Sequence, residues 1–400
     1  MSRPRVLHIG KYYPPYKGGM ETHLQELCRA TSKHLDLEVI VANDSTQTIT
    51  EFDGSIRVHR VGTLASVSSA PICPGMVRAI RNTPADIIHF HAPNPAAALA
   101  YFASRHPARL VVTHQSDIIR QRVLKFFYEP LLRRLMQRAS AIICLSPNYI
   151  ESSAILGRHR DKCNVIPHGL DPEQFGQAEG EEISAIRDRY GSNLVLAVGR
   201  LVYYKGFDYL IRAVAHTDAT LLIIGAGPLR DHLLRIATGL GIAGRVYLLG
   251  EVPDVRPYYR AARVFALPSI ARSEAFGIVQ LEAMASGTPV VNTNLDSGVP
   301  FVSLNGVSGI TVPARDAEAL SEALNRLLHD DLMHRRMSEG ARFRVREMFT
   351  LSTMANRTVE LYRQVLGTKE KAAALGWPPL SNPKNLSSAK DREACGYLHN

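Results

Sequence analysis

The sequence lacks the features that mark several large classes of protein. Its five cysteines are scattered, odd in number and never spaced as Cys-x-x-Cys, which indicates reduced thiols in a cytosolic protein and excludes a disulfide-stapled fold. No apolar run approaches the roughly 20 residues of a membrane-spanning helix. The first residues lead directly into a strand-like segment, so no signal peptide is predicted. We expect a cytoplasmic protein whose contact with a membrane is peripheral.

Other absences restrict the ligands. The formal net charge is +10 with a pI near 9.4, which favours anionic partners. However, no zinc-finger spacing and no aromatic-basic RNA motif occurs, so nucleic acid is not expected. No Asp-x-Asp, His-x3-His or His-Glu-x-x-His spacing occurs either, so we predict no metal and no cofactor. Nucleotides and phospholipid headgroups remain as candidate ligands.

What the sequence has is a regular alternation of short apolar runs with amphipathic stretches. This pattern is typical of βαβ units and predicts an α/β fold with parallel sheets. The first series of predicted strands is 6–10, 38–42, 56–61, 86–90, 110–113, 141–145 and 164–166, with clear helices at 20–33 and 123–138. A second series follows at 194–199, 221–224, 246–249, 264–266, 289–292 and 310–312.

The restart of the series predicts two Rossmann-like domains with a ligand at the carboxyl ends of strands in the cleft between them. Residues 169–191 are polar and rich in Gly, Asp, Glu and Gln, and we place the linker there. One large sheet is the alternative, which the length and the polar break disfavour. The amino-acid composition changes again after Gly367, where a weakly ordered tail is predicted.

Two cations follow the first strand of the second series. Arg200 and Lys205 lie in the turn Gly-Arg-Leu-Val-Tyr-Tyr-Lys-Gly that starts at Gly199. At the carboxyl end of a strand, they would bind a diphosphate and stabilise the charge of a leaving phosphate. A solvated basic loop is the alternative interpretation.

Two glutamates lie eight residues apart in a strand-to-helix segment. Glu274 follows a strand, the backbone N–H groups of Gly277 and Ile278 open the next helix, and Glu282 lies about two turns along it. The neighbours of Glu282 are small and apolar, and a carboxylate in such surroundings is seldom unpaired. A ribose diol would satisfy it. A salt bridge is the alternative for Glu282, and a favourable interaction with the helix dipole for Glu274.

Two further segments at predicted strand ends are candidates. Gly18 and Gly19 precede a helix, where they suit a phosphate loop or, equally simply, a plain turn. His114 ends an apolar strand, so a sugar contact is plausible there, although a lone histidine is more often structural. His89, His91 and His168 have similar local settings, but no His-x3-His, His-Glu-x-x-His or Cys/His spacing occurs.

One helix-like stretch, 123–138, is both apolar and basic. Basic residues cluster in and just before it at Arg120, Arg122, Lys125, Arg133, Arg134 and Arg138. It suits an amphipathic helix on an anionic membrane surface. It equally suits a surface helix whose apolar side packs on the sheet.

Taken in order, these motifs resemble the retaining family 4 glycosyltransferases of the GT-B fold. The resemblance covers roughly residues 5–366 and rests on Gly18-Gly19, His114, 167–171, 199–206 and 274–291. The segment 292–303 further resembles mannosyltransferase-like enzymes that build bacterial O-antigen and other surface polysaccharides. One departure is His168, where many members carry Asn.

The resemblance implies four domain segments. Residues 1–180 would form the acceptor-side domain and 181–351 the nucleotide-sugar domain. Residues 352–366 would form a helix that crosses back to the first domain, and 367–400 the tail. The implied substrates are a GDP- or UDP-linked hexose and a glycan acceptor that is linked to a lipid diphosphate.

It also implies a role for each candidate residue. Arg200 and Lys205 would hold the diphosphate, Glu274 the sugar hydroxyls, Glu282 the ribose, and His114 would lie near the reacting carbon. Gly18, Gly19, Phe276, Gly277 and Ile278 would approach the sugar and phosphates, and Val252 would lie near the base. The resemblance implies no metal and no cofactor. It also implies no enzymic nucleophile, because the acceptor would attack on the face that the phosphate leaves and the leaving phosphate would itself deprotonate it.

Two alternatives remain on the sequence alone. The non-hydrolysing nucleotide-sugar 2-epimerases share this two-domain fold, but the carboxylates expected in their first domain have no clear match here. A non-catalytic partner subunit would not need to keep Arg200, Lys205, Glu274 and Glu282 together.

Overall fold

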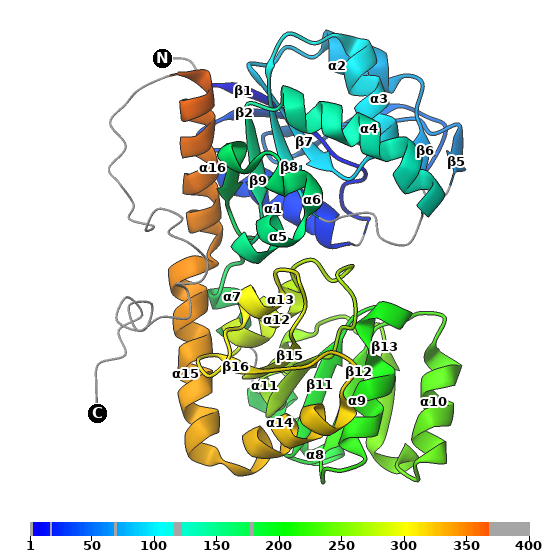
Figure 1. Cartoon of the computed structure of the whole chain (residues 1–400), viewed down its shortest axis with the longest axis vertical. Helices are drawn as coiled ribbons and strands as arrows, with labels where there is room; N and C mark the ends of the chain where they lie inside the picture. Colours follow the sequence, from blue (N-terminus) through cyan, green and yellow to red (C-terminus); the bar gives the residue numbers. More distant parts are fainter. Residues whose placement is uncertain (1–2, 17, 68–69, 116–121, 177–179, 368–400) are drawn as a thin grey trace.

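The chain folds into two α/β domains that lie one above the other in Figure 1, with two long helices along one side. The computed structural model describes residues 3–16, 18–67, 70–115, 122–176 and 180–367. The predicted tail therefore lies outside the described residues. No helix among the described residues is long and apolar enough to cross a bilayer.

The first domain is built on an eight-stranded sheet of order β10-β9-β8-β7-β1-β2-β4-β3. Its strands are β1 (Arg5–Ile9), β2 (Asp36–Ala42), β3 (Ile49–Asp53), β4 (Ile56–Val61), β7 (Ile87–Ala92), β8 (Arg109–His114), β9 (Ala141–Cys144) and β10 (Cys163–Val165). All neighbours run parallel except β3, which is antiparallel to β4. A separate antiparallel pair consists of β5 (Ala65–Val67) and β6 (Ala70–Ile72).

The second domain is built on a fully parallel sheet of order β13-β12-β11-β14-β15-β16. Its strands are β11 (Leu194–Val198), β12 (Thr220–Ile224), β13 (Val246–Gly250), β14 (Val264–Leu267), β15 (Val290–Thr293) and β16 (Gly309–Val312). All six coincide with predicted strands to within a residue or two, because strands buried on both faces give continuous apolar runs.

Helices connect and cover both sheets. The first domain has α1 (Gly19–Thr31), α2 (Met76–Asn82), α3 (Pro95–Ser104), α4 (Arg122–Arg138), α5 (Pro147–Ser152) and α6 (Ala154–Gly157). They are followed by α7 (Glu173–Gly176), α8 (Gly180–Tyr190), α9 (Phe207–Val214), α10 (Arg230–Gly239), α11 (Arg256–Ala261), α12 (Ile278–Ala285), α13 (Val299–Val302), α14 (Ala317–His329), α15 (Asp331–Met348) and α16 (Leu351–Leu366). Short 3₁₀ turns occupy Arg160–Lys162, Tyr203–Lys205 and Ala243–Arg245.

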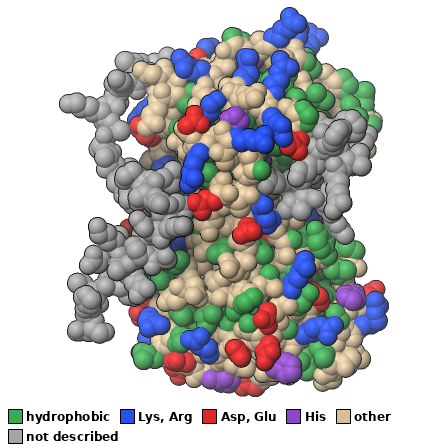
Figure 2. All heavy atoms as spheres, viewed as in Figure 1, with side chains coloured by type: hydrophobic (Ala, Val, Ile, Leu, Met, Phe, Trp, Pro, Cys, Tyr) green, Lys and Arg blue, Asp and Glu red, His purple; other side chains and the backbone are tan. Residues whose placement is uncertain are grey.

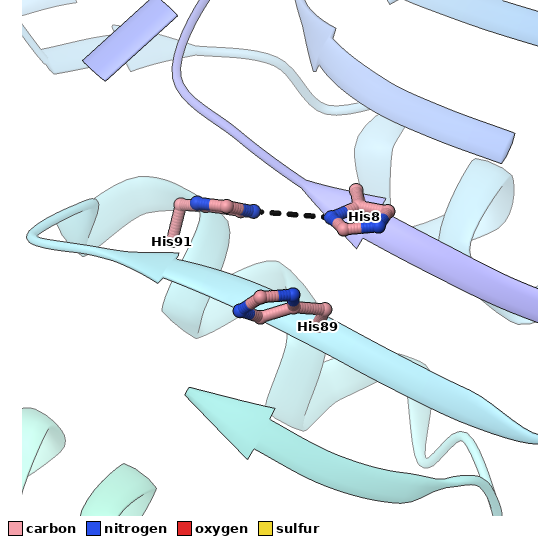
Figure 3. A group of neighbouring side chains, drawn as sticks. All are labelled: His8, His89 and His91. Atoms are coloured by element: carbon pink, nitrogen blue, oxygen red, sulfur yellow. Dashed lines mark hydrogen bonds between the residues drawn. The ribbon is translucent and has the colours of Figure 1, made fainter. Parts of the chain in front are cut away.

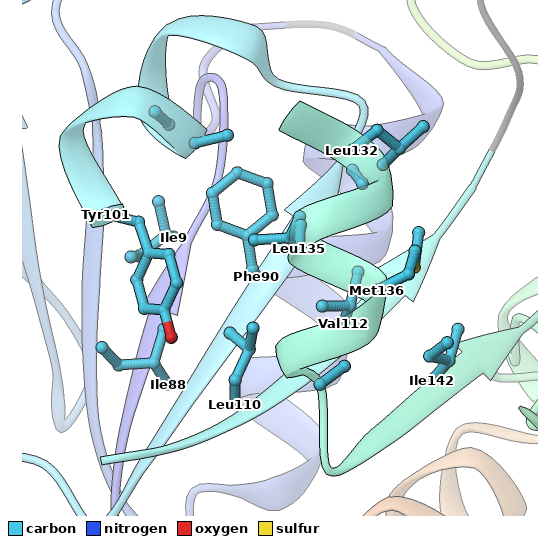
Figure 4. Close-up of a cluster of buried hydrophobic side chains, with 14 of the residues drawn as sticks. Ile9, Ile88, Phe90, Tyr101, Leu110, Val112, Leu132, Leu135, Met136 and Ile142 are labelled. Carbon is cyan, nitrogen blue, oxygen red and sulfur yellow. The ribbon is translucent and has the colours of Figure 1, made fainter. Parts of the chain in front are cut away.

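The core of the first domain shows why α4 forms where it does. Side chains alternate between the two faces of each strand, so Ile9 and Phe90 point to one face, where they meet Leu132, Leu135 and Met136 of α4 (Figure 4). The apolar side of α4 thus packs on the sheet, as the second interpretation of this stretch expects. The opposite face is covered by α1 and α16.

The segment predicted as a polar linker is largely helical. Residues 169–191 contain α7 and α8, and α8 packs against α11 of the second domain. Ile183 and Ile186 are three residues apart on one side of α8 and contact the second core, where Tyr190 is also buried. The linker prediction was wrong about this part because two apolar residues in a polar stretch are enough to dock a short helix.

The chain crosses between the two domains at two segments, and these two segments lie side by side. Leu170 donates its backbone N–H to Phe349 O at 2.8 Å, and Leu351 donates to Leu170 O at 3.0 Å. A Cβ at Gly169 would lie 2.3 Å from the carbonyl oxygen of Thr350, so only glycine allows this approach. Beyond the crossing, α16 packs against α1 in the first domain.

Candidate active site between the two domains

The candidate residues of the second domain gather where its sheet changes direction. β11 lies between β12 and β14, so the chain leaves β11 toward one side and β14 toward the other. Arg200 follows β11 and Glu274 follows β14. In open parallel sheets, ligands bind at the carboxyl ends of strands at this switch point.

Lys205 and Glu274 form a buried ion pair at this point. Lys205 Nζ lies 2.6 Å from Glu274 Oε2, and both residues are 8% exposed. The hydroxyl of Ser269 donates to the same carboxylate oxygen at 3.0 Å. A buried pair of opposite charges holds its geometry, because separating the charges leaves each one desolvated and unpaired. The sequence placed both residues in the site, but it did not show this contact or the role of Ser269.

The backbone at Gly199 explains how Lys205 reaches this position. Gly199 has a φ of 151°, and a Cβ on it would lie 3.0 Å from Lys205 Cε. The missing side chain leaves room for the lysine stem over the end of β11. Arg200, the next residue, is exposed, and its guanidinium therefore supplies the second cation of this turn from the solvent side.

The start of α12 is where the first domain touches the site. Gly277 has a left-handed φ of 74° and precedes Ile278, while Phe276 is buried in the second core. A Cβ at Gly19 would lie 3.3 Å from Ile278 Cδ1, so the Gly18-Gly19 loop of the first domain lies directly against the first turn of α12.

Glu21 lies in the first turn of α1, next to this loop, and the sequence interpretation missed it. Its carboxylate folds back over the loop, since a Cβ at Gly18 would lie 2.3 Å from Glu21 Oε2. Burial raises the pKa of this carboxyl group, whereas a backbone hydrogen bond and the charge of Lys11 lower it. Its only sequence signal is a position in the first helical turn, where acidic residues are common for dipole reasons alone.

Glu282 has a protein partner that the sequence did not reveal. The hydroxyl of Tyr259 donates to Glu282 Oε2 at 2.7 Å. Burial raises the pKa of Glu282, and the hydrogen bond from Tyr259 opposes that rise. Val252 lies in the loop after β13, half-buried against the second core.

His114 ends β8 of the first domain, and its side chain is buried. Its ring lies 6.0 Å from that of Tyr149. Arg272 of the second domain stacks over Tyr149 at 5.8 Å and donates to Ser152 Oγ at 3.0 Å. The surroundings of His114 are thus connected to the loop that carries Glu274.

The other strand-end histidines separate into two groups. His168 lies at the domain crossing, 2.9 Å from His23 Nδ1 and 3.1 Å from Glu26 Oε2. His89 and His91 of β7 lie together with His8 of the neighbouring strand β1 (Figure 3). The site residues described above do not include His89, His91 or His168.

Two domains with parallel sheets, and a site of cations and carboxylates where they meet, define a GT-B-type glycosyltransferase. Sucrose-phosphate synthase from Thermosynechococcus elongatus superimposes with a TM-score of 0.78, covering 92% of this chain and 100% of that one at 21% identity. Anabaena Alr3699/HepE in complex with UDP-glucose gives 0.72, covering 90% and 100% at 22% identity. These likenesses confirm the predicted fold class.

The sequence comparisons then give the family. The family model Glycosyltransferase Family 4 matches residues 17–174, and Glycosyl transferases group 1 matches residues 180–344. O-antigen chain mannosyltransferase C of Escherichia coli is 32% identical over 91% of this chain and 100% of its own length. D-rhamnosyltransferase WbpZ of Pseudomonas aeruginosa is 33% identical over 86% and 92%. The chain belongs to the family 4 glycosyltransferases, and the epimerase and partner-subunit alternatives are not favoured.

Proposed function

We propose that this enzyme transfers a hexose from a GDP- or UDP-linked donor to a glycan acceptor of cell-surface polysaccharide synthesis, with retention of configuration. The observation that carries the proposal is the buried Lys205–Glu274 pair at the switch point of the second sheet. The names of its relatives support the substrate class: they include an O-antigen mannosyltransferase and a GDP-mannose-dependent enzyme of Mycolicibacterium smegmatis.

The diphosphate would lie between the two cations and the start of α12. Arg200 and Lys205 offer positive charge, and the first N–H groups of a helix lack partners within the helix. Negative charge on the diphosphate grows as the bond to the sugar breaks, so these fixed groups stabilise the transition state more than the bound substrate. Because two cations would face the phosphates, we infer that no divalent cation is needed for transfer.

Each carboxylate would bind hydroxyls of the sugar donor through its second oxygen. In the described part of the chain, the contacts of Glu274 with Lys205 and Ser269 both fall on Oε2, which leaves Oε1 for the hexose. In the same way, Tyr259 occupies Oε2 of Glu282, and Oε1 would accept from the ribose. Charge-assisted hydrogen bonds of this kind fix the orientation of the sugar.

For the chemical step, we propose attack of the acceptor oxygen on the face that the diphosphate leaves. The bond from the anomeric carbon to the phosphate oxygen breaks, the bond to the acceptor oxygen forms, and the acceptor proton passes to the leaving phosphate. His114 would contact the sugar near the reacting carbon from the first domain. No side chain acts as a nucleophile in this scheme.

A transfer assay tests the proposal. Labelled hexose from GDP-mannose or a UDP-hexose should appear in a lipid-linked glycan acceptor, and rates should be unchanged after treatment with EDTA. Conversion of the sugar donor into its 2-epimer without transfer would support an epimerase instead. Loss of activity in EDTA with recovery on added Mn²⁺ would contradict the metal-independent step.

Glu282→Ala should weaken nucleotide binding, because it removes a charge-assisted hydrogen bond to the ribose. The expected cost is about 1.5–3 kcal/mol, or roughly 10- to 150-fold in Kd. Calorimetric titration with GDP and UDP measures it. Tyr259→Phe is the matched control: it removes one hydroxyl group from Glu282 but keeps the carboxylate, so the loss should be smaller. Equal Kd values for Glu282→Ala and the wild type would contradict the ribose role.

We also propose that the acceptor is met at the inner face of the membrane. The basic side chains in the second half of α4 bind the protein itself: Arg133 pairs with Glu129, Arg134 stacks on Phe102 and Arg138 donates to Tyr101. On the face seen in Figure 2, Lys and Arg are mixed with acidic side chains over both domains. The net charge of +10, more than any one patch, therefore supports attraction to anionic lipid.

Vesicle co-sedimentation tests this attraction. The full chain should pellet with anionic vesicles at low salt and be released as salt is raised, because the Debye length shrinks from about 30 Å at 0.01 M to 8 Å at 0.15 M. Equal pelleting with neutral vesicles, or none with anionic ones, would contradict it.

A further inference from the structure

Three buried histidines share one face of the first sheet. His8 lies on β1, and His89 and His91 lie on the neighbouring strand β7, where His8 is in register with His89. His89 and His91 are two residues apart, so both point to the face covered by α1 and α16. Their exposed fractions are 0%, 0% and 4%. Positions of this kind normally hold aliphatic side chains, as Val6 and Ile87 do on the same face.

The nitrogen atoms of these rings converge. One ring nitrogen from each of the three lies within 4.8 Å of the others, and His8 Nδ1 and His91 Nε2 are 3.1 Å apart and point at each other (Figure 3). Ligands of tetrahedral zinc, bound at about 2.0–2.1 Å, lie roughly 3.3 Å apart. The 3.1 Å between His8 Nδ1 and His91 Nε2 is close to this separation.

The hydrogen bonds of the group are incomplete. Within the described residues, His8 Nε2 and His91 Nδ1 are buried without a hydrogen-bond partner. His89 is the exception, with Thr113 Oγ1 at 2.6 Å and the Tyr362 hydroxyl at 2.5 Å on its two nitrogens. The unpartnered nitrogens of His8 and His91 are the outer nitrogens of the two rings, whereas the nitrogens that face each other are His8 Nδ1 and His91 Nε2.

The chemistry of the group suits a transition metal. Imidazole nitrogen is a ligand that suits zinc, copper, iron and nickel, and this group offers three buried imidazole rings. Neutral imidazole is the form that binds metals. Both ring nitrogens of His89 have hydrogen-bond partners, so an ion would replace one partner, and the other would remain as the outer hydrogen bond that usually orients a metal-bound imidazole.

We propose that His8, His89 and His91 form a structural site for a zinc-type metal ion that ties β1 to β7 beneath α16. His23 of α1 is the candidate for a fourth ligand: its Nε2 is also buried without a partner among the described residues, and its ring lies 6.0 Å from that of His91. None of these residues belongs to the sugar-donor site, so this inference stands independently of the proposed function.

The test is metal content of the tag-free full-length enzyme, grown with zinc and dialysed. About one zinc per chain is expected by elemental analysis, and Co²⁺ uptake should give the visible absorption of a tetrahedral nitrogen site. His8→Leu and His91→Leu should lower the zinc content at least about tenfold, and added zinc should no longer raise Tm. His216→Leu, at an exposed histidine, is the control and should keep both.

If the variants fail to fold, the wild-type protein alone still tests whether the metal site exists. Wild-type protein that holds no zinc, takes up no Co²⁺ and shows no rise in Tm with zinc would overturn the site and leave a stack of neutral histidines. Zinc retained in folded His91→Leu would overturn it too, since the ion would then lie elsewhere.

Discussion

Replacing Lys205 by methionine is expected to lower kcat about 10²- to 10³-fold, with a smaller change in KM. The physical reason is that the ammonium group neutralises charge that appears on the diphosphate as the sugar leaves, and loss of one such contact typically has this effect. Steady-state kinetics of label transfer measure it. Lys162→Met is the matched control, because within the described residues Lys162 donates to the backbone carbonyls of Gln137 and Ala139, away from the site.

The contribution of Lys205 to stability can be measured separately from its contribution to catalysis. Lys205→Met leaves the buried carboxylate of Glu274 without its cation, and breaking a buried pair costs about 3–5 kcal/mol. Adding Glu274→Gln removes the stranded charge, so the double variant should recover much of the lost Tm. Its kcat should stay low. If kcat returned together with Tm, Lys205 would be a structural residue and its role in the transition state would be wrong.

Glu274→Gln by itself is expected to lower kcat roughly 10- to 150-fold, equivalent to about 1.5–3 kcal/mol. The neutral amide keeps the shape of the side chain, but it weakens the charge-assisted bonds to the hexose and to Lys205. The Kd for free GDP or UDP should change much less, because the proposed nucleotide contacts are made by Glu282 and α12.

Glu129→Gln gives the comparison for this prediction. Glu129 also pairs with a cation, Arg133, but on the exposed surface of α4, where an ion pair contributes little. Wild-type kcat in both variants would exclude Glu274 from the sugar site. A large loss of nucleotide affinity with unchanged kcat would place it on the nucleotide instead.

The sequence predicted the buried strands of both sheets well, but it missed the edge strand β3 and the helix α8. Strands buried on both faces, such as β11 and β14, are continuous apolar runs with a clear signal. The edge strand β3 was missed, since most of its residues are exposed and Thr50, Glu51 and Asp53 are polar. The helix α8 was taken for linker because tertiary contacts of Ile183 and Ile186 stabilise it, and local pattern does not show such contacts.

The candidate site was predictable as positions but not as contacts. A parallel sheet brings strand ends to one edge, so the placement of Arg200, Lys205 and Glu274 followed from the order of elements. The ion pair between Lys205 and Glu274, and the bond from Tyr259 to Glu282, depend on side-chain directions across 69 and 23 positions of the chain. No local spacing rule contains that information.

The histidine group shows the same limit. Metal motifs are recognised by ligands that lie a few residues apart in the chain. Here one ring comes from β1 and two from β7, which are far apart in the chain and adjacent only because the strand order places β7 next to β1. His-x-His on a strand puts two rings on one face, but the third ring appears only in the folded sheet.

The most direct test of the central claim is thermal unfolding of the full chain in the presence of GDP, UDP, ADP and their hexose conjugates. A ligand at 100 times its Kd stabilises the folded state by about 2.7 kcal/mol. The account predicts that GDP or UDP raises Tm, that its hexose conjugate raises it further in the wild type, and that Glu274→Gln removes the extra rise while keeping the first. No change in Tm with any nucleotide would contradict a nucleotide-sugar site at Lys205, Glu274 and Glu282.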